Sequence, residues 1–139
     1  MNDFGLSFHH FGLAVRHPAD AFTYLRGLGY TEGAELFDPL QCVNLAMRHH
    51  AEMPDVEVVW PGDQPSPIDT LIKRNGSLIY HQCYVCHDVA NALASIDAAG
   101  LRVMPVSLAK PAALFGGTEV SFYNIVNVGV VELIHGDPA

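Results

Sequence analysis

The stretch HFGLAV at residues 10–15 has a counterpart in the second half of the chain, HQCYVC at residues 81–86. The alignment of His10 with His81 also matches the small and apolar residues that follow, and each copy then reaches a glycine, Gly29 in the first and Gly100 in the second. In each copy this pattern predicts a short apolar strand, followed by a helix of about ten residues that ends at the glycine. The chain therefore contains an internal repeat.

A second pair of matching stretches closes the two copies. VEVVWPGD at residues 56–63 resembles VELIHGD at residues 131–137, with Glu57 aligned to Glu132. The two glutamates are further apart in the sequence than the two histidines, which implies about four extra residues in the second copy. We place them in residues 110–117, which are rich in Pro, Ala and Gly and predict a loop.

Between the helix and the closing strand, each copy has room for two more strands of ordinary length. Their predicted ranges are 30–38 and 41–48 in the first copy, and 101–108 and 119–125 in the second. Each copy is therefore expected to be a βαβββ module, the first at about residues 8–63 and the second at about residues 77–137.

The segment SPIDTLIKRN, which begins at Ser66, predicts a helix that links the two modules. Ser66 is the expected N-cap, Pro67 suits the first helical position, and Gly76 is the expected terminator. With this linker, at about residues 64–76, we expect an α+β chain that forms one domain over residues 1–139.

The amino-acid composition limits the classes of protein to which the chain can belong. Half of the 139 residues are hydrophobic and 16% are charged, so a filled core is expected and disorder is not. Seven Lys and Arg residues against fifteen Asp and Glu residues give a net charge of −8, which argues against a nucleic-acid partner. No apolar run approaches the roughly 20 residues of a membrane helix, and the N-terminus MNDFGLSFHHF shows no secretory signal. Three cysteines in a chain without an export signal favour reduced thiols in the cytoplasm.

Each module carries a His early in its first strand and a Glu in its last strand, where a buried strand normally has Val or Ile. These residues are His10 and Glu57 in the first module, and His81 and Glu132 in the second. An unpaired ionised carboxylate in such a strand costs several kcal/mol, so a compensating partner is expected. A single strand Glu commonly faces solvent, and a single strand His is more often hydrogen-bonded than a ligand, but the repeat places both types at matching positions twice. We therefore expect the four side chains to bind one divalent metal ion, Zn, Co, Ni, Mn or Fe.

The other cysteines and histidines have simpler interpretations. Cys83 and Cys86 have a C-x-x-C spacing, but residues three apart on a strand point to opposite faces, so both are expected to be core residues. His49 and His50 follow a predicted strand and are expected to be solvated at a hairpin tip. The remaining histidines have no matched partners and are expected to be structural: His9, His17, His87 and His135.

Together these motifs resemble the vicinal oxygen chelate superfamily, from about residue 8 to residue 135. The matching motifs are His10-x-Gly-x-Ala-Val, Val56-Glu57-Val58 before Pro61-Gly62, Ser66-Pro67-Ile68, Tyr80-His81 and Gly129-Val-Val-Glu132-Leu. Within the superfamily the resemblance is closest to methylmalonyl-CoA epimerases and glyoxalase I-like proteins. It implies a cupped, barrel-like mixed sheet around a metal held by the four His and Glu residues, commonly within dimers. It also implies that Phe115, Phe122 and Asn124 line the substrate pocket.

One region departs from the epimerase pattern. The epimerases use a further Glu, on the third strand of the first module, as one of two bases, whereas residues 40–47 contain no carboxylate here. Two-base epimerisation is therefore disfavoured, unless the thiol of Cys42 replaces the missing group. Glyoxalase-like enzymes use a metal-bound Glu as the base, and Glu132, or less readily Glu57, is expected to take that role.

The expected function is that of a metal-dependent lyase or isomerase that enolises a small carbonyl compound or an acyl thioester. We expect a cytoplasmic homodimer that has this small molecule as its partner and binds neither nucleic acid nor membrane. One alternative is a ring-cleaving dioxygenase, which needs iron with two His, one carboxylate and open positions, so the fourth ligand Glu57 argues against it. The other is a non-catalytic small-molecule-binding or resistance protein of the same fold, which needs no complete ligand set.

Overall fold

The computed structural model describes residues 2–138, and its chain divides into two compact units. The first unit comprises residues 10–80. The second comprises the described N-terminal residues up to His9 and the chain from His81 onward. Each unit has the element order predicted from the repeat, so the two βαβββ modules are confirmed and the fold class is α+β. That the whole chain acts as one domain stays a prediction.

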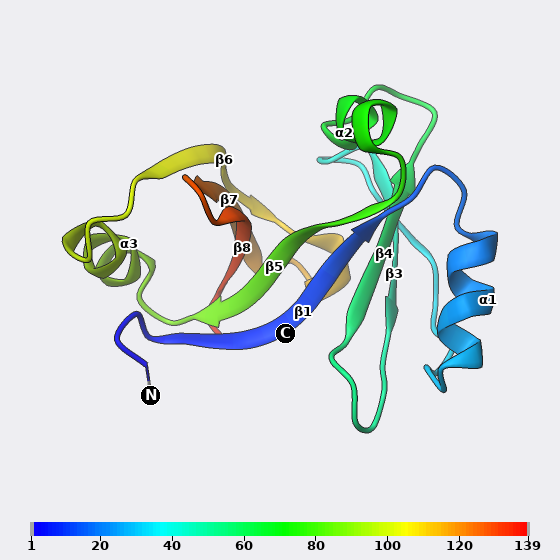
Figure 1. Cartoon of the computed structure of the whole chain (residues 1–139), viewed down its shortest axis with the longest axis horizontal. Helices are drawn as coiled ribbons and strands as arrows, with labels where there is room; N and C mark the ends of the chain where they lie inside the picture. Colours follow the sequence, from blue (N-terminus) through cyan, green and yellow to red (C-terminus); the bar gives the residue numbers. More distant parts are fainter. Residues whose placement is uncertain (1, 139) are drawn as a thin grey trace. The chain divides into compact units, whose positions relative to one another are not determined.

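The first unit contains a mixed sheet with the strand order β2-β3-β4-β1 (Figure 1). Its elements are β1 (Leu6–Ala14, from His10 onward), α1 (Ala19–Gly27), β2 (Leu36–Asp38), β3 (Val43–Arg48), β4 (Val56–Pro61) and α2 (Ile68–Asn75). Strands β2, β3 and β4 are antiparallel neighbours, whereas β4 runs parallel to β1. The parallel pair therefore places the first and last strands of the module side by side.

The second unit repeats this arrangement with the strand order β5-β8-β7-β6. Its elements are β5 (Leu78–Cys86, from His81 onward), α3 (Val89–Ala98), β6 (Val103–Pro111), a short 3-10 helix (Ala113–Phe115), β7 (Glu119–Ile125) and β8 (Gly129–His135). Strands β6, β7 and β8 are antiparallel neighbours, and β8 runs parallel to β5. The strand predicted at residues 119–125 is confirmed over its whole length.

In each unit the first helix covers one face of the sheet and forms a hydrophobic core with it. In the first unit this core comprises Val15, Leu25, Tyr30 and Val58. In the second unit it comprises Cys86, Ala92, Ile96, Ile125, Val131 and Leu133. Ala92 and Ile96 are four residues apart in α3 and so lie on the same helix face. Because side chains alternate along a strand, the neighbours of these core residues project from the opposite face of each sheet.

The helix ends agree only in part with the sequence prediction. Gly76 ends α2 with φ 70°, a left-handed conformation that favours glycine, as predicted. The predicted N-cap is wrong, because Pro67 occupies that position, and Ser66 instead donates through its backbone N–H and its hydroxyl to the carboxylate of Asp69 at 2.9 and 3.1 Å. In α3 the carboxylate of Asp88 accepts the backbone N–H of Asn91 at 3.0 Å. Within residues 2–138, no helix is long and apolar enough to cross a membrane.

The strand predicted at residues 30–38 is wrong over most of its length, since only Leu36–Asp38 pair with β3. The buried carboxylate of Asp38 accepts the backbone N–H groups of Leu40 and Gln41 at 2.9 and 3.2 Å and so fixes a turn. Cys42 follows in this turn with φ 57°. For this reason β3 begins later than predicted, at Val43 and not at residue 41.

Two of the roughly four extra residues of the second copy lie in β6 and not in the predicted loop. Leu36 pairs with Leu45 in the first unit, and Lys110 pairs with Val120, the residue that corresponds to Leu45, in the second. Lys110 is therefore the structural counterpart of Leu36. The alignment of His10 with His81 would instead match Leu36 with Ser107, so most of the insertion already precedes Lys110. The register of β6 shifts twice between Pro105 and Lys110, which accommodates these residues as bulges.

Candidate functional site

In the first unit, His10 of β1 and Glu57 of β4 lie on the sheet face opposite α1. Glu57 pairs with Gly12 in the parallel ladder, and His10, two residues earlier, projects from the same face. The His10 Nε2 and Glu57 Oε1 atoms are 3.7 Å apart, and the two residues are 0% and 5% exposed. The strand pairing thus brings an imidazole and a carboxylate together inside the first module.

In the second unit, His81 of β5 and Glu132 of β8 form the corresponding pair. Glu132 pairs with Cys83, again two residues after the histidine. The His81 Nε2 and Glu132 Oε1 atoms are 3.2 Å apart, and both residues are 3% exposed. The register is therefore the same in the two modules: the histidine stands two residues before the strand partner of the glutamate.

The chemistry of these donors fits a divalent metal ion. Imidazole nitrogen and carboxylate oxygen are both ligands of Zn, Co, Ni, Mn and Fe(II). Ligand atoms about 2.1 Å from an ion, at roughly tetrahedral or octahedral angles, lie about 3.0–3.4 Å from one another. The His81–Glu132 distance falls within this range, and the His10–Glu57 distance is slightly longer. Each pair can therefore act as half of a ligand set.

The sequence comparison decides the family. Residues 9–122 match the model of the Glyoxalase/Bleomycin resistance protein/Dioxygenase superfamily. The chain belongs to this superfamily. No curated protein sequence gives a significant match to the chain.

Solved structures with the same fold include epimerases. Methylmalonyl-CoA epimerase from Mycobacterium tuberculosis is 18% identical, with a TM-score of 0.75 over 95% of this chain and 89% of that chain. A hypothetical protein from Bacillus halodurans is 21% identical, with a TM-score of 0.76 over 96% of both chains. Streptomyces coelicolor methylmalonyl-CoA epimerase in complex with 2-nitronate-propionyl-CoA is 18% identical, with a TM-score of 0.71 over 94% of this chain and 98% of that chain. At these identities the likeness establishes the fold of this superfamily member and not its reaction.

Two of the three predicted pocket residues lie on the sheet face of the second His–Glu pair. Phe122 of β7 pairs with Glu132, and its ring meets the ring of His81 edge to face, with centroids 5.5 Å apart. Asn124, two residues further along β7, projects from the same face. Phe115 lies in the 3-10 helix and is 5% exposed, with its ring 5.4 Å from that of His9. The glutamate of this unit therefore has an aromatic and an amide neighbour on its own face.

The corresponding face of the first unit is apolar around Glu57. Met47 pairs with Glu57, and Leu45 projects from the same face of β3. Cys42, considered as a substitute for the missing glutamate, lies in the turn before β3, and its thiol donates to the Pro39 carbonyl at 3.6 Å. Strand β3 therefore supplies no second acid or base beside Glu57.

The expected core positions of Cys83 and Cys86 are confirmed, whereas the expectation for His50 is wrong. Cys83 and Cys86 are buried in β5, and burial raises the pKa of Cys86 more strongly than its backbone hydrogen bond at Asp88 lowers it. His49 is exposed and bonds to Asp55 at 2.8 Å. His50 was expected to be solvated, but its Nδ1 accepts two backbone N–H groups while its Nε2 donates to the Leu28 carbonyl at 2.9 Å. His50 therefore closes the hairpin after β3.

Two polar contacts in the cores were missed by sequence reasoning. His135 lies beside the hydroxyl of Ser121 at 2.7 Å, on the helix-covered face of the second unit. In the first unit Arg48 is 7% exposed, although an Arg at the end of an apolar strand is usually solvated. No periodicity in the sequence distinguishes such a residue from an ordinary surface arginine.

Proposed function

We propose that this superfamily member is a metal-dependent lyase or isomerase, epimerase-like or glyoxalase-like, that enolises a small carbonyl compound or an acyl thioester. The observation that carries the proposal is the identical His–Glu register in the two modules. If only one module had a buried His–Glu pair, many structural explanations would be available. Its repetition on the same sheet face is what a shared catalytic site built from a duplicated module requires.

We propose that His10, Glu57, His81 and Glu132 together hold one divalent metal ion. Such an ion supplies Lewis-acid polarisation of a substrate carbonyl oxygen and so makes the adjacent C–H group acidic. The low exposure of the four residues supports this assignment, because water competes little with buried ligands. The identity of the ion is open among Zn, Co, Ni, Mn and Fe.

Glu132 is the proposed base. One of its carboxylate oxygens takes the proton as the C–H bond breaks, and the electron pair of that bond moves toward the carbonyl oxygen. Phe122 and Asn124 share its sheet face and are the proposed substrate contacts, with Phe115 from the preceding loop. Glu57 is the second choice, because its neighbours Leu45 and Met47 offer no polar group to orient a substrate.

The proposal favours one base over two. The face of β3 beside Glu57 carries Leu45 and Met47, so a second proton donor from this strand is missing. A one-base enzyme removes and returns the proton with the same carboxylate, as expected of a glyoxalase-like isomerase or lyase. The thioester class is proposed from the fold shared with the epimerases, and the net charge of −8 favours a small or weakly anionic substrate.

The test is exchange of the acidic α-hydrogen of a candidate thioester or hydroxy-ketone for solvent deuterium, followed by NMR in metal-supplemented protein. Glu132→Gln keeps an oxygen ligand but cannot accept a proton, so exchange should fall by about 10²–10⁴-fold. Glu119→Gln, an exposed change in the same unit, is the matched control and should exchange at the wild-type rate. Undiminished exchange in metal-loaded Glu132→Gln would remove Glu132 as the base.

Two further outcomes separate the alternatives. If Cys42→Ala abolishes exchange, the thiol of the turn acts as the base and the assignment to Glu132 is wrong. If no candidate exchanges in metal-loaded wild-type protein, the non-catalytic binding protein becomes the better description. We also propose a cytoplasmic homodimer. That none of the three cysteines forms a disulfide supports the location, and light scattering of the purified protein tests the oligomeric state.

A further inference from the structure

Arg48, the last residue of β3, carries a buried charge. It is 7% exposed, and a guanidinium remains protonated at every physiological pH. A buried charge is normally paired with an opposite charge, because its removal from water costs several kcal/mol. Among residues 2–138, no carboxylate forms an ion pair with this side chain.

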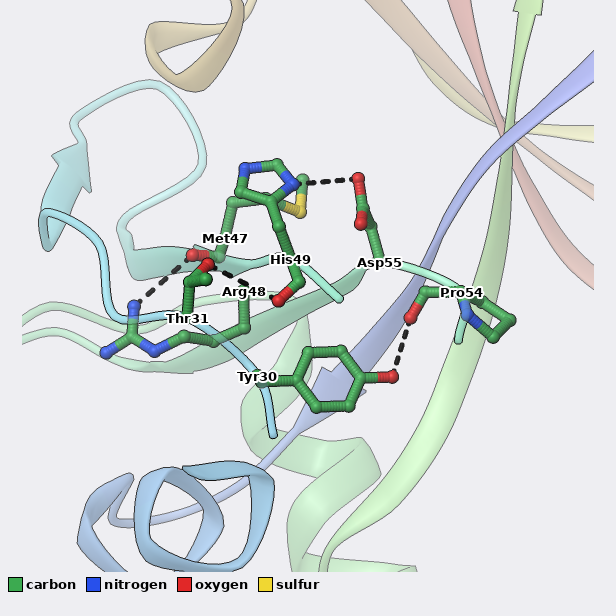
Figure 2. A network of polar contacts seen from close by, with 7 residues as sticks. All are labelled: Tyr30, Thr31, Met47, Arg48, His49, Pro54 and Asp55. Carbon is green, nitrogen blue, oxygen red and sulfur yellow. Dashed lines mark hydrogen bonds and ion pairs between the residues drawn. The ribbon is translucent and has the colours of Figure 1, made fainter. Parts of the chain in front are cut away.

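The contacts of Arg48 use only part of its hydrogen-bonding capacity. Its Nη1 donates to the carbonyl oxygens of Gly33 and Met47, both at 3.3 Å. The guanidinium carbon also lies 4.1 Å from the centroid of the Phe22 ring. Figure 2 shows the bond toward Met47, with the other terminal nitrogen directed away from that carbonyl. The Nε and Nη2 donors therefore remain for a further partner.

A cavity of about 450 Å³ lies at this side chain, within the range of small-molecule sites. It is lined by α1, which contributes Phe22 and Arg26, by Tyr30 and the segment that follows it, and by Arg48. Arg26 and Glu32 are exposed and form an ion pair at 3.2 Å, so their charges largely cancel at the rim. Arg48 is thus the buried positive charge of the wall.

The internal repeat explains why the cavity exists. Arg48 pairs with Val56 in the first unit, and Tyr123 pairs with Val131, the residue that corresponds to Val56, in the second. Tyr123 is therefore the counterpart of Arg48. Tyr123 packs against the helix-covered core, and Pro105 of β6 pairs with it. In the first unit residues 30–35 form no strand, and the residue that contacts Arg48 here is Gly33, which has no side chain. The shortened β2 and this glycine therefore leave space beside Arg48.

This cavity is distinct from the proposed metal site. Met47 pairs with Glu57, whereas Arg48 pairs with the next residue, Val56, and so projects from the opposite face of the sheet. Val56 and Phe22 both pack on the helix-covered core of this unit. A molecule bound at Arg48 would therefore lie between the sheet and α1, behind Glu57.

We propose that this cavity binds a small organic carboxylate, whose two oxygens accept hydrogen bonds from Arg48. The planar guanidinium matches a carboxylate in a two-bond arrangement and gains from burial. Because Glu32 is paired with Arg26, Glu35 is the remaining carboxylate of the lining, and it repels a dianion or polyphosphate more strongly than a monocarboxylate. The aromatic side chains of Phe22 and Tyr30 give an apolar wall for the organic part of the ligand.

The experiment titrates ¹⁵N-labelled, chelator-treated protein with benzoate and, separately, with inorganic phosphate, and it follows the backbone amide resonance of Gly33, which lines the cavity and is present in every variant. In the wild type the Arg48 Nε–H resonance is followed as well, and benzoate should give a saturable shift of both. Arg48→Met should weaken benzoate binding by about tenfold or more, because the methionine keeps the stem but removes the charged donors. Arg74→Met, the same change at the exposed end of α2, should bind like the wild type.

Each other result counts against the proposal. No saturable shift with benzoate, or full binding by Arg48→Met, would show that Arg48 is a structural residue only. Tighter binding of phosphate than of benzoate would overturn the carboxylate assignment. If Arg48→Met does not fold, Arg48→Lys takes its place and should also bind about tenfold less tightly, since an ammonium lacks the planar pair of donors. Equal affinity in that variant would refute the two-bond geometry.

Discussion

Metal binding should stabilise the folded chain, and the gain in the free energy of unfolding should depend equally on the ligands of both modules. The four proposed ligands are at most 5% exposed, and they come from four strands that are far apart in the sequence. An unfolded chain does not hold these groups together, so the ion binds the native state selectively. At a free metal concentration of 100 times Kd, the stabilisation is about 2.7 kcal/mol.

The size of the melting shift follows from the length of the chain. Unfolding entropy of about 2.1 cal/mol/K per residue gives about 0.29 kcal/mol/K for 139 residues. A stabilisation of about 2.7 kcal/mol then raises Tm by about 9 °C. The assay is thermal unfolding of chelator-treated protein, followed by circular dichroism, before and after addition of Zn, Co, Ni or Mn.

Ligand variants distinguish one shared ion from two independent ions. If the site is shared, Glu57→Gln and Glu132→Gln should each reduce the shift, to about 1–2 °C where affinity falls 100-fold. The exposed changes Glu52→Gln and Glu119→Gln should keep the full shift. If each variant instead keeps about half of the increment, the modules bind separate ions and the shared site is refuted. An unchanged Tm in protein that elemental analysis shows to be metal-loaded would refute the linkage altogether.

Three other predictions concern stability and reactivity. Burial, and then the charge of Asp55, raise the pKa of Tyr30 above 10.0, so this tyrosine contributes stability in full below that pH and loses it as the pH rises through the folded pKa. Urea unfolding across this alkaline range should show the decline, and Tyr30→Phe should flatten it; an equally steep decline in the variant would contradict the assignment. Asp88→Ala should lower the unfolding free energy by about 1 kcal/mol through loss of the N-cap of α3, whereas Asp88→Asn should lose little. Burial raises the pKa of Cys86, so a thiol reagent should modify Cys42 in native protein long before Cys86, as peptide mapping would show.

The internal repeat made most of the fold predictable. Two alignments, one through the paired histidines and one through the paired glutamates, place the strands and helices of both modules, since the same apolar pattern must serve the same structure twice. The prediction failed where local chemistry overrides apolar pattern. Residues 30–35 contain Tyr and Thr, which favour strands, yet Glu32-Gly33 interrupts this pattern and the segment forms no strand. The turn bonds of Asp38 and the bulges of β6 depend on tertiary pairing that no single sequence displays.

The candidate ligands were predictable for the same reason, because a polar residue that recurs at one position of a buried strand needs an explanation in both copies. Their common register was not predictable, since the sequence does not say which residue of β1 faces Glu57. Nor does it say that Met47 and Leu45, rather than Cys42, share the face of that carboxylate. Strand pairing decides both, and the second also reflects the turn before β3, where Cys42 has a φ of 57° that L-residues seldom adopt.

The two modules have similar side chains on the His–Glu face of the sheet and different ones on the helix-covered face. The difference concerns Arg48 and its counterpart Tyr123. On the His–Glu face, Met47 and its counterpart Phe122 are both apolar residues that stand opposite a glutamate. On the helix-covered face, Tyr123 packs against its core and pairs with Pro105, whereas Arg48 contacts Gly33, which has no side chain. A tyrosine at position 48 would therefore lie against an open cavity, while an arginine there can hold a ligand. Because the two faces are separated by the sheet, the first module can acquire such a second site without moving Glu57 from its register with Gly12.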